Sequence, residues 1–151
     1  MKLSAEQIVQ NWERLLEVIK TEFSGERQTK LLSMYTDLED RMSTQPASSI
    51  DHYHNAFDGG YVDHVLRVIE CAQEVYDLWT RMGADMSGYT KEELIFVALN
   101  HDIGKMGFPG EGNEIYQPND SEWHRKNLGK EYKVNPNNPF TLVNDLSIWL
   151  L

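Results

Sequence analysis

The segment YVDHVLRVIECAQEVYDLWTRM, residues 61–82, gives the clearest indication of fold class. Apolar residues recur in it every three or four positions, which is typical of an amphipathic helix that packs a broad face on a core. The members of this face are Val62, Val65, Leu66, Ile69, Ala72, Val75, Tyr76 and Trp79. The sequence therefore predicts a long helix over about 61–82 that takes part in a helical core.

The part of the chain before this helix is also predicted to be helical. Ser4, with Gln7 three residues later, has the pattern of a capping box and predicts the start of a first helix. A second helix is expected over about 26–42. The segment 43–60 is rich in serine, proline and glycine, so we expect it to be a loop.

The part of the chain after the long helix contains a short helix and then many turn-forming residues. Thr90 and Glu93 form a second capping-box pattern and predict a helix that runs to about residue 100. Glycine and proline are frequent over 103–140, which predicts a long loop with one helical turn near 121–130. A last helix is expected to begin near residue 140.

Length and composition limit the classes of protein. A chain of 151 residues fits one domain, and its formal net charge of −10 disfavours binding to a long nucleic acid. The single cysteine, Cys71, excludes an intrachain disulfide and fits a reducing compartment, so we expect a cytoplasmic protein. We find no signal peptide and no apolar run of about 18 residues, and therefore expect no association with a membrane.

Two histidines and an aspartate are candidates for binding a metal ion. His64 lies on the long helix, and His101 and Asp102 lie at the end of the helix that Thr90 begins. Imidazole and carboxylate are ligands of divalent transition metals. In the structural alternative, His64 is a core histidine with a backbone partner, and His101 and Asp102 only cap a helix.

The two motifs that carry these residues resemble those of the HD-domain superfamily of metal-dependent phosphohydrolases. In that family one helix carries the first histidine, and a later helix ends in a His-Asp pair. Here the motifs are HNAFDGGYVDH, residues 54–64, and ALNHDIGK, residues 98–105. The resemblance implies an all-α, single-domain helical bundle over 1–151 with a long loop after the His-Asp pair. Residues 1–45 would be N-terminal helices and residues 50–151 the HD core.

The resemblance also implies roles for individual residues. His64 would be the first metal ligand, and His101 and Asp102 the central ligands. Asp102 would also orient or deprotonate the attacking water. Lys105 would hold a substrate phosphate, and His54 would line the site as a proton donor or phosphate contact. The cofactor would be a divalent ion, one of Mn, Co, Ni, Fe, Zn and Mg.

The remaining ligands that the resemblance implies are harder to place. The family needs a further carboxylate from a later helix, for which Asp145 is the best position; the alternative is that Asp145 faces solvent. His124 is the downstream histidine that would serve as an additional ligand. The sequence stops on four apolar residues, 148–151, so we expect a fragment truncated at its C-terminus, which would leave a ligand outside it.

These residues predict a hydrolase that cleaves a phosphate ester. We expect the substrate to be a small phosphorylated molecule, with a nucleotide preferred over a long nucleic acid because the chain is acidic. One alternative is a degenerate HD-type domain that binds or regulates without catalysis. A further alternative is a helical interaction protein in which the placement of the histidines is a coincidence.

Overall fold

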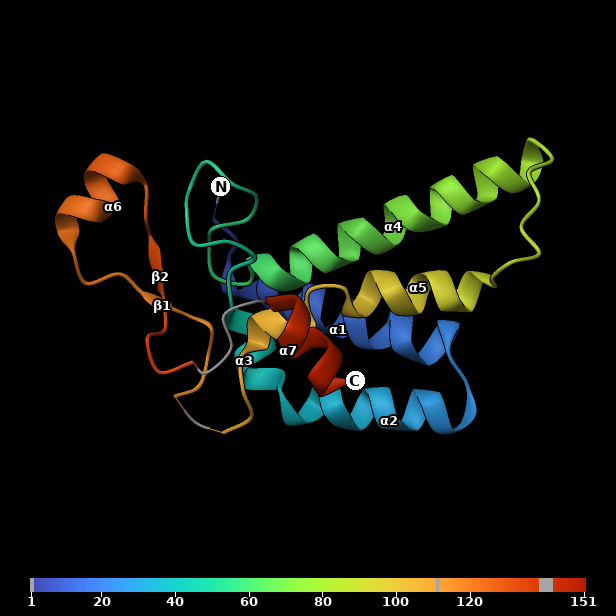
Figure 1. Cartoon of the computed structure of the whole chain (residues 1–151), viewed down its shortest axis with the longest axis horizontal. Helices are drawn as coiled ribbons and strands as arrows, with labels where there is room; N and C mark the ends of the chain where they lie inside the picture. Colours follow the sequence, from blue (N-terminus) through green and yellow to red (C-terminus); the bar gives the residue numbers. More distant parts are fainter. Residues whose placement is uncertain (1, 111, 139–142) are drawn as a thin grey trace.

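The computed structural model describes residues 2–110, 112–138 and 143–151, and it is mostly helical, as the sequence predicts (Figure 1). None of the helices in this described part combines the length and the apolar character that a membrane crossing requires. The elements follow one another in the order α1 (Ala5–Glu22), α2 (Gly25–Asp37), α3 (Glu39–Thr44), α4 (Gly60–Arg81), α5 (Lys91–Asn100), the 3-10 helix η1 (Ile103–Met106), β1 (Tyr116–Pro118), α6 (Glu122–Leu128), β2 (Tyr132–Val134) and α7 (Val143–Leu150).

Both predicted capping boxes are present. Ser4 Oγ accepts the backbone N–H of Gln7 at 3.2 Å, and Gln7 Oε1 accepts the backbone N–H of Ser4 at 2.9 Å. At the start of α5, Thr90 Oγ1 accepts the backbone N–H of Glu93 at 3.1 Å, and Glu93 Oε2 accepts the backbone N–H of Thr90 at 2.7 Å. Each pair satisfies two backbone donors that the first helical turn would otherwise leave without partners.

The core lies between the helices of the bundle. α4 packs against α1, α3 and α5, and α1 also packs against α2. Burial of apolar surface among these helices is the main force that holds them together. The side chains with no exposed surface include Leu15, Ile19, Tyr35, Met42, Tyr61, Val65, Ile95 and Leu99.

The helix expected over 26–42 is interrupted. Leu38 leaves helical geometry with φ −105° and ψ 7°, so α2 ends at Asp37 and α3 begins at Glu39. No glycine or proline marks this position, and for this reason the periodicity of the sequence did not reveal the break. After the break, Arg41 on α3 donates hydrogen bonds to the carbonyls of Met106 and Phe108 at 2.8 and 2.9 Å. α3 thereby holds the chain that follows η1.

The expected apolar face of the long helix is buried only in its first half. Val75 is 42% exposed and Trp79 is 50% exposed. Figure 1 shows the reason: the C-terminal end of α4 diverges from α5 and projects from the bundle. The helix expected over about 61–82 is confirmed as Gly60–Arg81, and the second half of its apolar face lies at the surface.

The region 103–140 contains more structure than the sequence predicted. The helical turn expected near 121–130 is confirmed as α6, but α6 lies between two short strands that pair as an antiparallel hairpin. The register pairs Tyr116 with Val134 and Pro118 with Tyr132. Strands of three residues are too short to show an alternating pattern, so the sequence did not reveal them.

The last helix packs directly on η1. The start expected near residue 140 falls on residues 139–142, which lie outside the described residues, and α7 is described from Val143. Gly104 is the point of closest approach: its N–H donates to Ser147 Oγ at 2.8 Å. A Cβ on Gly104 would lie 2.1 Å from the carbonyl oxygen of Val143, so only glycine fits beneath α7.

Candidate metal centre

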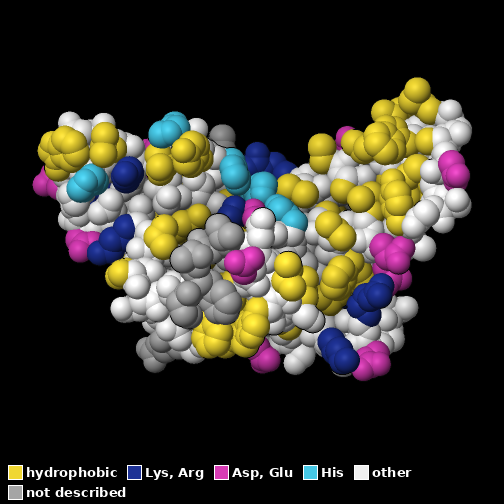
Figure 2. All heavy atoms as spheres, viewed as in Figure 1, with side chains coloured by type: hydrophobic (Ala, Val, Ile, Leu, Met, Phe, Trp, Pro, Cys, Tyr) yellow, Lys and Arg dark blue, Asp and Glu magenta, His cyan; other side chains and the backbone are white. Residues whose placement is uncertain are grey.

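Two helices and one loop bring the candidate ligands together. His64 lies in the second turn of α4, and His101 and Asp102 follow the last residue of α5. Because α4 and α5 pack side by side, these residues meet although 36 residues separate His64 from His101 in the sequence. Figure 2 shows histidine side chains gathered in the hollow between the two projecting ends of the molecule.

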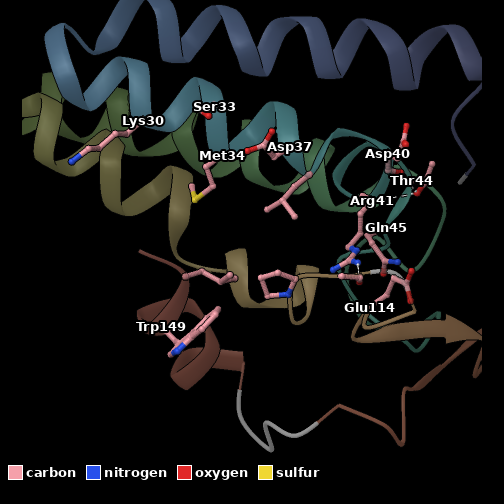
Figure 3. A pocket seen from close by; sticks show the side chains of 14 residues that line it. Lys30, Ser33, Met34, Asp37, Asp40, Arg41, Thr44, Gln45, Glu114 and Trp149 are labelled. Carbon is pink, nitrogen blue, oxygen red and sulfur yellow. Dashed lines mark hydrogen bonds between the residues drawn. The ribbon is translucent and has the colours of Figure 1, made fainter.

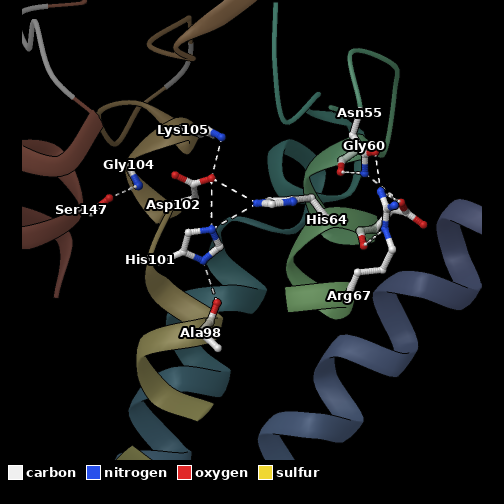
Figure 4. A network of polar contacts seen from close by, with 11 residues as sticks. Asn55, Gly60, His64, Arg67, Ala98, His101, Asp102, Gly104, Lys105 and Ser147 are labelled. Atoms are coloured by element: carbon white, nitrogen blue, oxygen red, sulfur yellow. Dashed lines mark hydrogen bonds and ion pairs between the residues drawn. The ribbon is translucent and has the colours of Figure 1, made fainter. Parts of the chain in front are cut away.

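Three potential ligand atoms form a small triangle. His64 Nε2 lies 3.2 Å from His101 Nε2 and 3.5 Å from Asp102 Oδ2, and His101 Nε2 lies 3.3 Å from the same oxygen (Figure 4). Ligands at about 2.1 Å from a zinc-sized cation lie roughly 3.0 to 3.4 Å from one another at octahedral and tetrahedral angles. The triangle therefore has dimensions that a single divalent cation can span.

The orientation of His101 suits a metal ligand. Its Nδ1 lies 2.8 Å from the carbonyl oxygen of Ala98, which is an acceptor, so Nδ1 carries a proton. In neutral imidazole the lone pair is then on Nε2, the nitrogen that faces His64 and Asp102. A second ring nitrogen held by a backbone carbonyl is the usual arrangement around metal-binding histidines.

Asp102 is held in its charged form. Burial would raise the pKa of this carboxyl, but hydrogen bonds from His101, whose Nε2 carries a proton in the charged form of the ring, from His64 and from Lys105 outweigh burial and lower the pKa well below its usual range. Lys105 is only 8% exposed, and its Nζ lies 2.6 Å from Asp102 Oδ2. The same carboxylate raises the pKa of His101 through their hydrogen bond. The site thus combines an ionised carboxylate with an imidazole that binds a proton more readily than a free histidine does.

The remaining predicted catalytic residue, His54, lies beside His64. The centroids of the two rings are 4.5 Å apart, and a ring nitrogen of His54 lies within 4.8 Å of the ligand atoms of His64 and Asp102. Burial, followed by the positive charges that His64 and Lys105 can carry, lowers the pKa of His54. His54 is therefore neutral at pH 7 and is close enough to contact a cation or a ligand in the site.

A network of polar contacts fixes the loop that carries His54. Asn55, in the left-handed region with φ 51°, donates to the carbonyl of Gly60 at 2.9 Å and to Asp63 at 2.8 Å. Arg67 bonds to Asn55 and forms an ion pair with Asp63 at 2.8 Å (Figure 4). A Cβ on Gly60 would lie 2.2 Å from the carbonyl oxygen of Asn55, so the glycine permits this close approach.

Tyr61 is a residue near the site to which the sequence analysis gave no role. Its side chain has no exposed surface, and its hydroxyl finds no hydrogen-bond partner among the described residues. Burial, and secondly the charge of Asp102, raise its pKa, so the hydroxyl keeps its proton. Tyr61 directly follows the Gly59-Gly60 pair of the first motif, but no pattern in the sequence distinguishes it from an ordinary core tyrosine.

Asp145 and His124 lie outside this group of ligands. Asp145 is exposed, because α7 turns Leu146 and Ser147 toward the body of the protein, and the preceding residue points about 100° away. His124 is exposed on α6, where its Nδ1 contacts Ser121 Oγ at 2.7 Å. Asp145 is thus a solvent-facing helix residue, and in the described part of the chain neither residue joins the candidate ligands.

A cavity of about 930 Å³ lies apart from the metal centre, between α2, α3 and the C-terminal segment (Figure 3). Its lining includes Lys30, Met34, Arg41 and Trp149 but none of the candidate ligands. The loop after η1 contributes Pro109 and Gly110 to its lining, and Arg41 contacts carbonyls of this segment. We therefore assign the cavity no part in the chemistry of the metal centre.

The donor set favours particular ions. Two imidazole nitrogens and one carboxylate suit Mn, Fe, Co, Ni and Zn, whereas Mg prefers a shell of oxygen atoms. No family model, no curated protein and no solved structure matches the chain. The similarity to the HD-domain superfamily therefore rests on the two sequence motifs, and the function has to be argued from the geometry of His64, His101 and Asp102.

Proposed function

We propose that this chain is a phosphohydrolase of the HD type that depends on a divalent metal ion. The observation that carries the proposal is the triangle of His64 Nε2, His101 Nε2 and Asp102 Oδ2, with sides of 3.2 to 3.5 Å. Three protein ligands leave coordination positions open, which is typical of catalytic rather than structural zinc sites. The proposed substrate is a small phosphorylated molecule, with nucleotides as the first candidates.

The residues around the triangle have the chemistry that such a reaction needs. The chemistry that a bound divalent cation supplies is a lower pKa for water and the polarisation of a phosphoryl oxygen. Asp102 is ionised, and its lowered pKa suits a metal ligand that would orient the attacking water rather than take its proton. Lys105 places an ammonium group beside it, which binds phosphate oxygens and offsets their charge. His54 is neutral and close enough to exchange a proton with a ligand.

The charge of the chain supports a small substrate over a polymer. With a formal net charge of −10, the surface repels a long phosphate backbone, and few cations are available to replace its counterions. Lys105 and Arg67 lie close enough to lower the pKa of His54, but each is paired with a carboxylate, Asp102 and Asp63 respectively. A net positive field at the site would therefore come from a bound divalent cation. A compact phosphate ester would be attracted by this field and would not have to lie along the large acidic surface of the protein.

A non-catalytic binding module is the second candidate function. It is favoured by one observation, namely that Asp145 and His124, the two further ligands implied by the resemblance, are exposed and outside the group. Such a module would bind metal through the same triangle but would not hydrolyse a phosphate ester. The two candidates therefore differ in turnover and agree in metal binding.

Metal binding is tested with the full chain purified without chelator. We expect about one equivalent of a transition metal per chain in the wild type, and a loss of at least tenfold in affinity in His64→Ala and Asp102→Ala. His124→Ala is the matched control, because it removes an exposed imidazole outside the triangle. Equal metal content in all four proteins, each folded by circular dichroism, would reject the proposed centre.

Catalysis is tested with the metal-loaded wild type. A screen of nucleotides, phosphomonoesters and phosphodiesters with Mn, Co, Ni, Fe and Zn should reveal release of phosphate or nucleoside, and Asp102→Ala should abolish it. Metal binding without turnover of any of these substrates would favour the binding module instead.

A further inference from the structure

The projecting half of α4 carries a row of exposed apolar side chains. Exposure is 42% for Val75, 43% for Leu78, 50% for Trp79 and 76% for Met82. Positions i, i+3, i+4 and i+7 lie on one side of a helix, so the four residues form a continuous row, here called the distal stripe. Figure 2 shows the hydrophobic side chains gathered on this projecting end.

The distal stripe continues one side of the face that packs on the core. Val68 and Ala72 are packed against the core, and at 100° per residue they point within about 70° of the centre of the stripe. The stripe is therefore the part of this face that the divergence of α4 from α5 leaves uncovered. A row of exposed apolar side chains of this size is typical of an interaction site.

The spacing of the distal stripe is symmetric about its midpoint between Leu78 and Trp79. If a second α4 runs antiparallel across it, Val75 meets Met82 of the other copy, and Leu78 meets Trp79 of the other copy. A two-fold axis requires such a surface, because each copy must present the same patch to the other.

The charges beside the distal stripe suit the same arrangement. Glu74 and Arg81 lie on one edge of the stripe, both are exposed, and no ion pair within the described chain uses either of them. In an antiparallel pair related by a two-fold axis, like edges lie side by side. With the axis between Leu78 and Trp79, Glu74 of one copy and Arg81 of the other are offset by about 3 Å along the helices, which their long side chains can span. Each dimer would contain this pair of opposite charges twice.

We propose that the distal stripe is the interface of a homodimer in which two α4 helices pair antiparallel. The four side chains, about half exposed, offer roughly 400 Å² of surface if each spans about 200 Å². A standard interface buries about 800 Å² per partner, so the stripe supplies half and the polar residues beside it the rest. An interface with a small apolar part is typical of a reversible dimer whose population depends on protein concentration.

The apolar contact is tested by sedimentation velocity of the full chain from 5 to 500 µM. The wild type should pass from monomer to dimer over this range. Trp79→Asp should raise the dissociation constant at least tenfold, because an aromatic residue at the centre of an interface contributes most to its affinity. Trp123→Asp is the matched control: Trp123 is 60% exposed on α6, away from the stripe, and its replacement should leave the constant unchanged.

The orientation is tested by charge reversal. Glu74→Arg alone or Arg81→Glu alone places like charges across the two-fold axis and should weaken the dimer several-fold. The double variant E74R/R81E restores opposite charges and should recover affinity close to that of the wild type. All of these residues are exposed, so the fold should be unchanged by circular dichroism.

The inference does not depend on the metal centre, because none of its residues is a candidate ligand. A wild type that stays monomeric to 500 µM overturns it and leaves the stripe to another partner. A dimer that is insensitive to Trp79→Asp, or equally sensitive to Trp123→Asp, overturns it as well. Failure of the double variant to regain affinity rejects the antiparallel arrangement.

Discussion

Replacement of Gly104 by alanine tests how the last helix is seated on η1, next to the candidate metal centre. The added methyl carbon would lie 2.1 Å from the carbonyl oxygen of Val143 and 2.8 Å from Ser147 Oγ. Ordinary van der Waals contacts begin near 3.4 Å. The carbonyl oxygen of Val143 is part of the backbone of α7 and cannot move on its own, so the whole of α7 must move away from η1 by about 1 Å.

The cost of this withdrawal follows from what α7 contacts. The hydrogen bond from the Gly104 N–H to Ser147 Oγ, 2.8 Å long, is weakened or lost, at about 1 kcal/mol. Overpacking of a filled site adds about 1–3 kcal/mol. Alanine restricts the unfolded chain more than glycine and recovers about 0.5 kcal/mol. We therefore expect Gly104→Ala to lower the free energy of unfolding by about 1.5–3.5 kcal/mol and Tm by about 3–14 °C.

Urea unfolding and differential scanning calorimetry of Gly104→Ala and of the wild type measure this change. Gly88→Ala is the matched control, because a Cβ on Gly88 would meet no atom within 4 Å. That variant should stay within about 0.5 kcal/mol of the wild type. If Gly104→Ala also stays within this margin, α7 does not rest on η1 and the reasoning is refuted.

Three further predictions concern single groups. Below the raised pKa of His101 its ring is protonated, and a metal ion must displace a proton to bind it. Metal affinity should therefore fall about tenfold per pH unit below that pKa. Isothermal titration calorimetry between pH 6 and 8 measures this, and a constant affinity would contradict it. Lys105→Met should keep metal binding but weaken the binding of inorganic phosphate to the metal-loaded protein about tenfold, measured by the same method. An unchanged phosphate affinity would contradict the proposed role of Lys105 in binding phosphate. Thr90→Ala removes the cap of α5 and should lower the free energy of unfolding, measured in urea, by about 1 kcal/mol. Thr80→Ala, on the exposed end of α4, is the control. Equal free energies of unfolding for the two variants would contradict the capping contribution.

The parts of the fold that local patterns specify could be predicted from the sequence. Ser4 with Gln7 and Thr90 with Glu93 mark helix starts through contacts three residues apart, and the structure confirms both. The proximity of His64 to His101 was expected from the pair of motifs, and the two nitrogens lie 3.2 Å apart. That these residues bind a metal remains a prediction, since proximity alone does not establish a ligand.

The parts that depend on distant contacts could not be predicted. The break at Leu38 lies where α3 turns its Arg41 toward carbonyls 65 and 67 residues away, and nothing near Leu38 indicates it. The exposure of Trp79 depends on the divergence of α4 from α5, which periodicity does not describe. Asp145 was the best carboxylate by position, but its direction is set by the neighbours that α7 buries.

The contact between Gly104 and Ser147 links the C-terminal helix to the candidate metal centre. η1 has four residues, and a single turn of this kind does not hold its shape in water without outside support. α7 gives part of this support through Ser147, and Arg41 of α3 gives another part at a carbonyl of η1. Asp102 precedes η1 and Lys105 lies within it, so we expect a displacement of α7 to disturb the carboxylate and the ammonium group together. Metal binding should then be coupled to the packing of a helix more than 40 positions later in the chain.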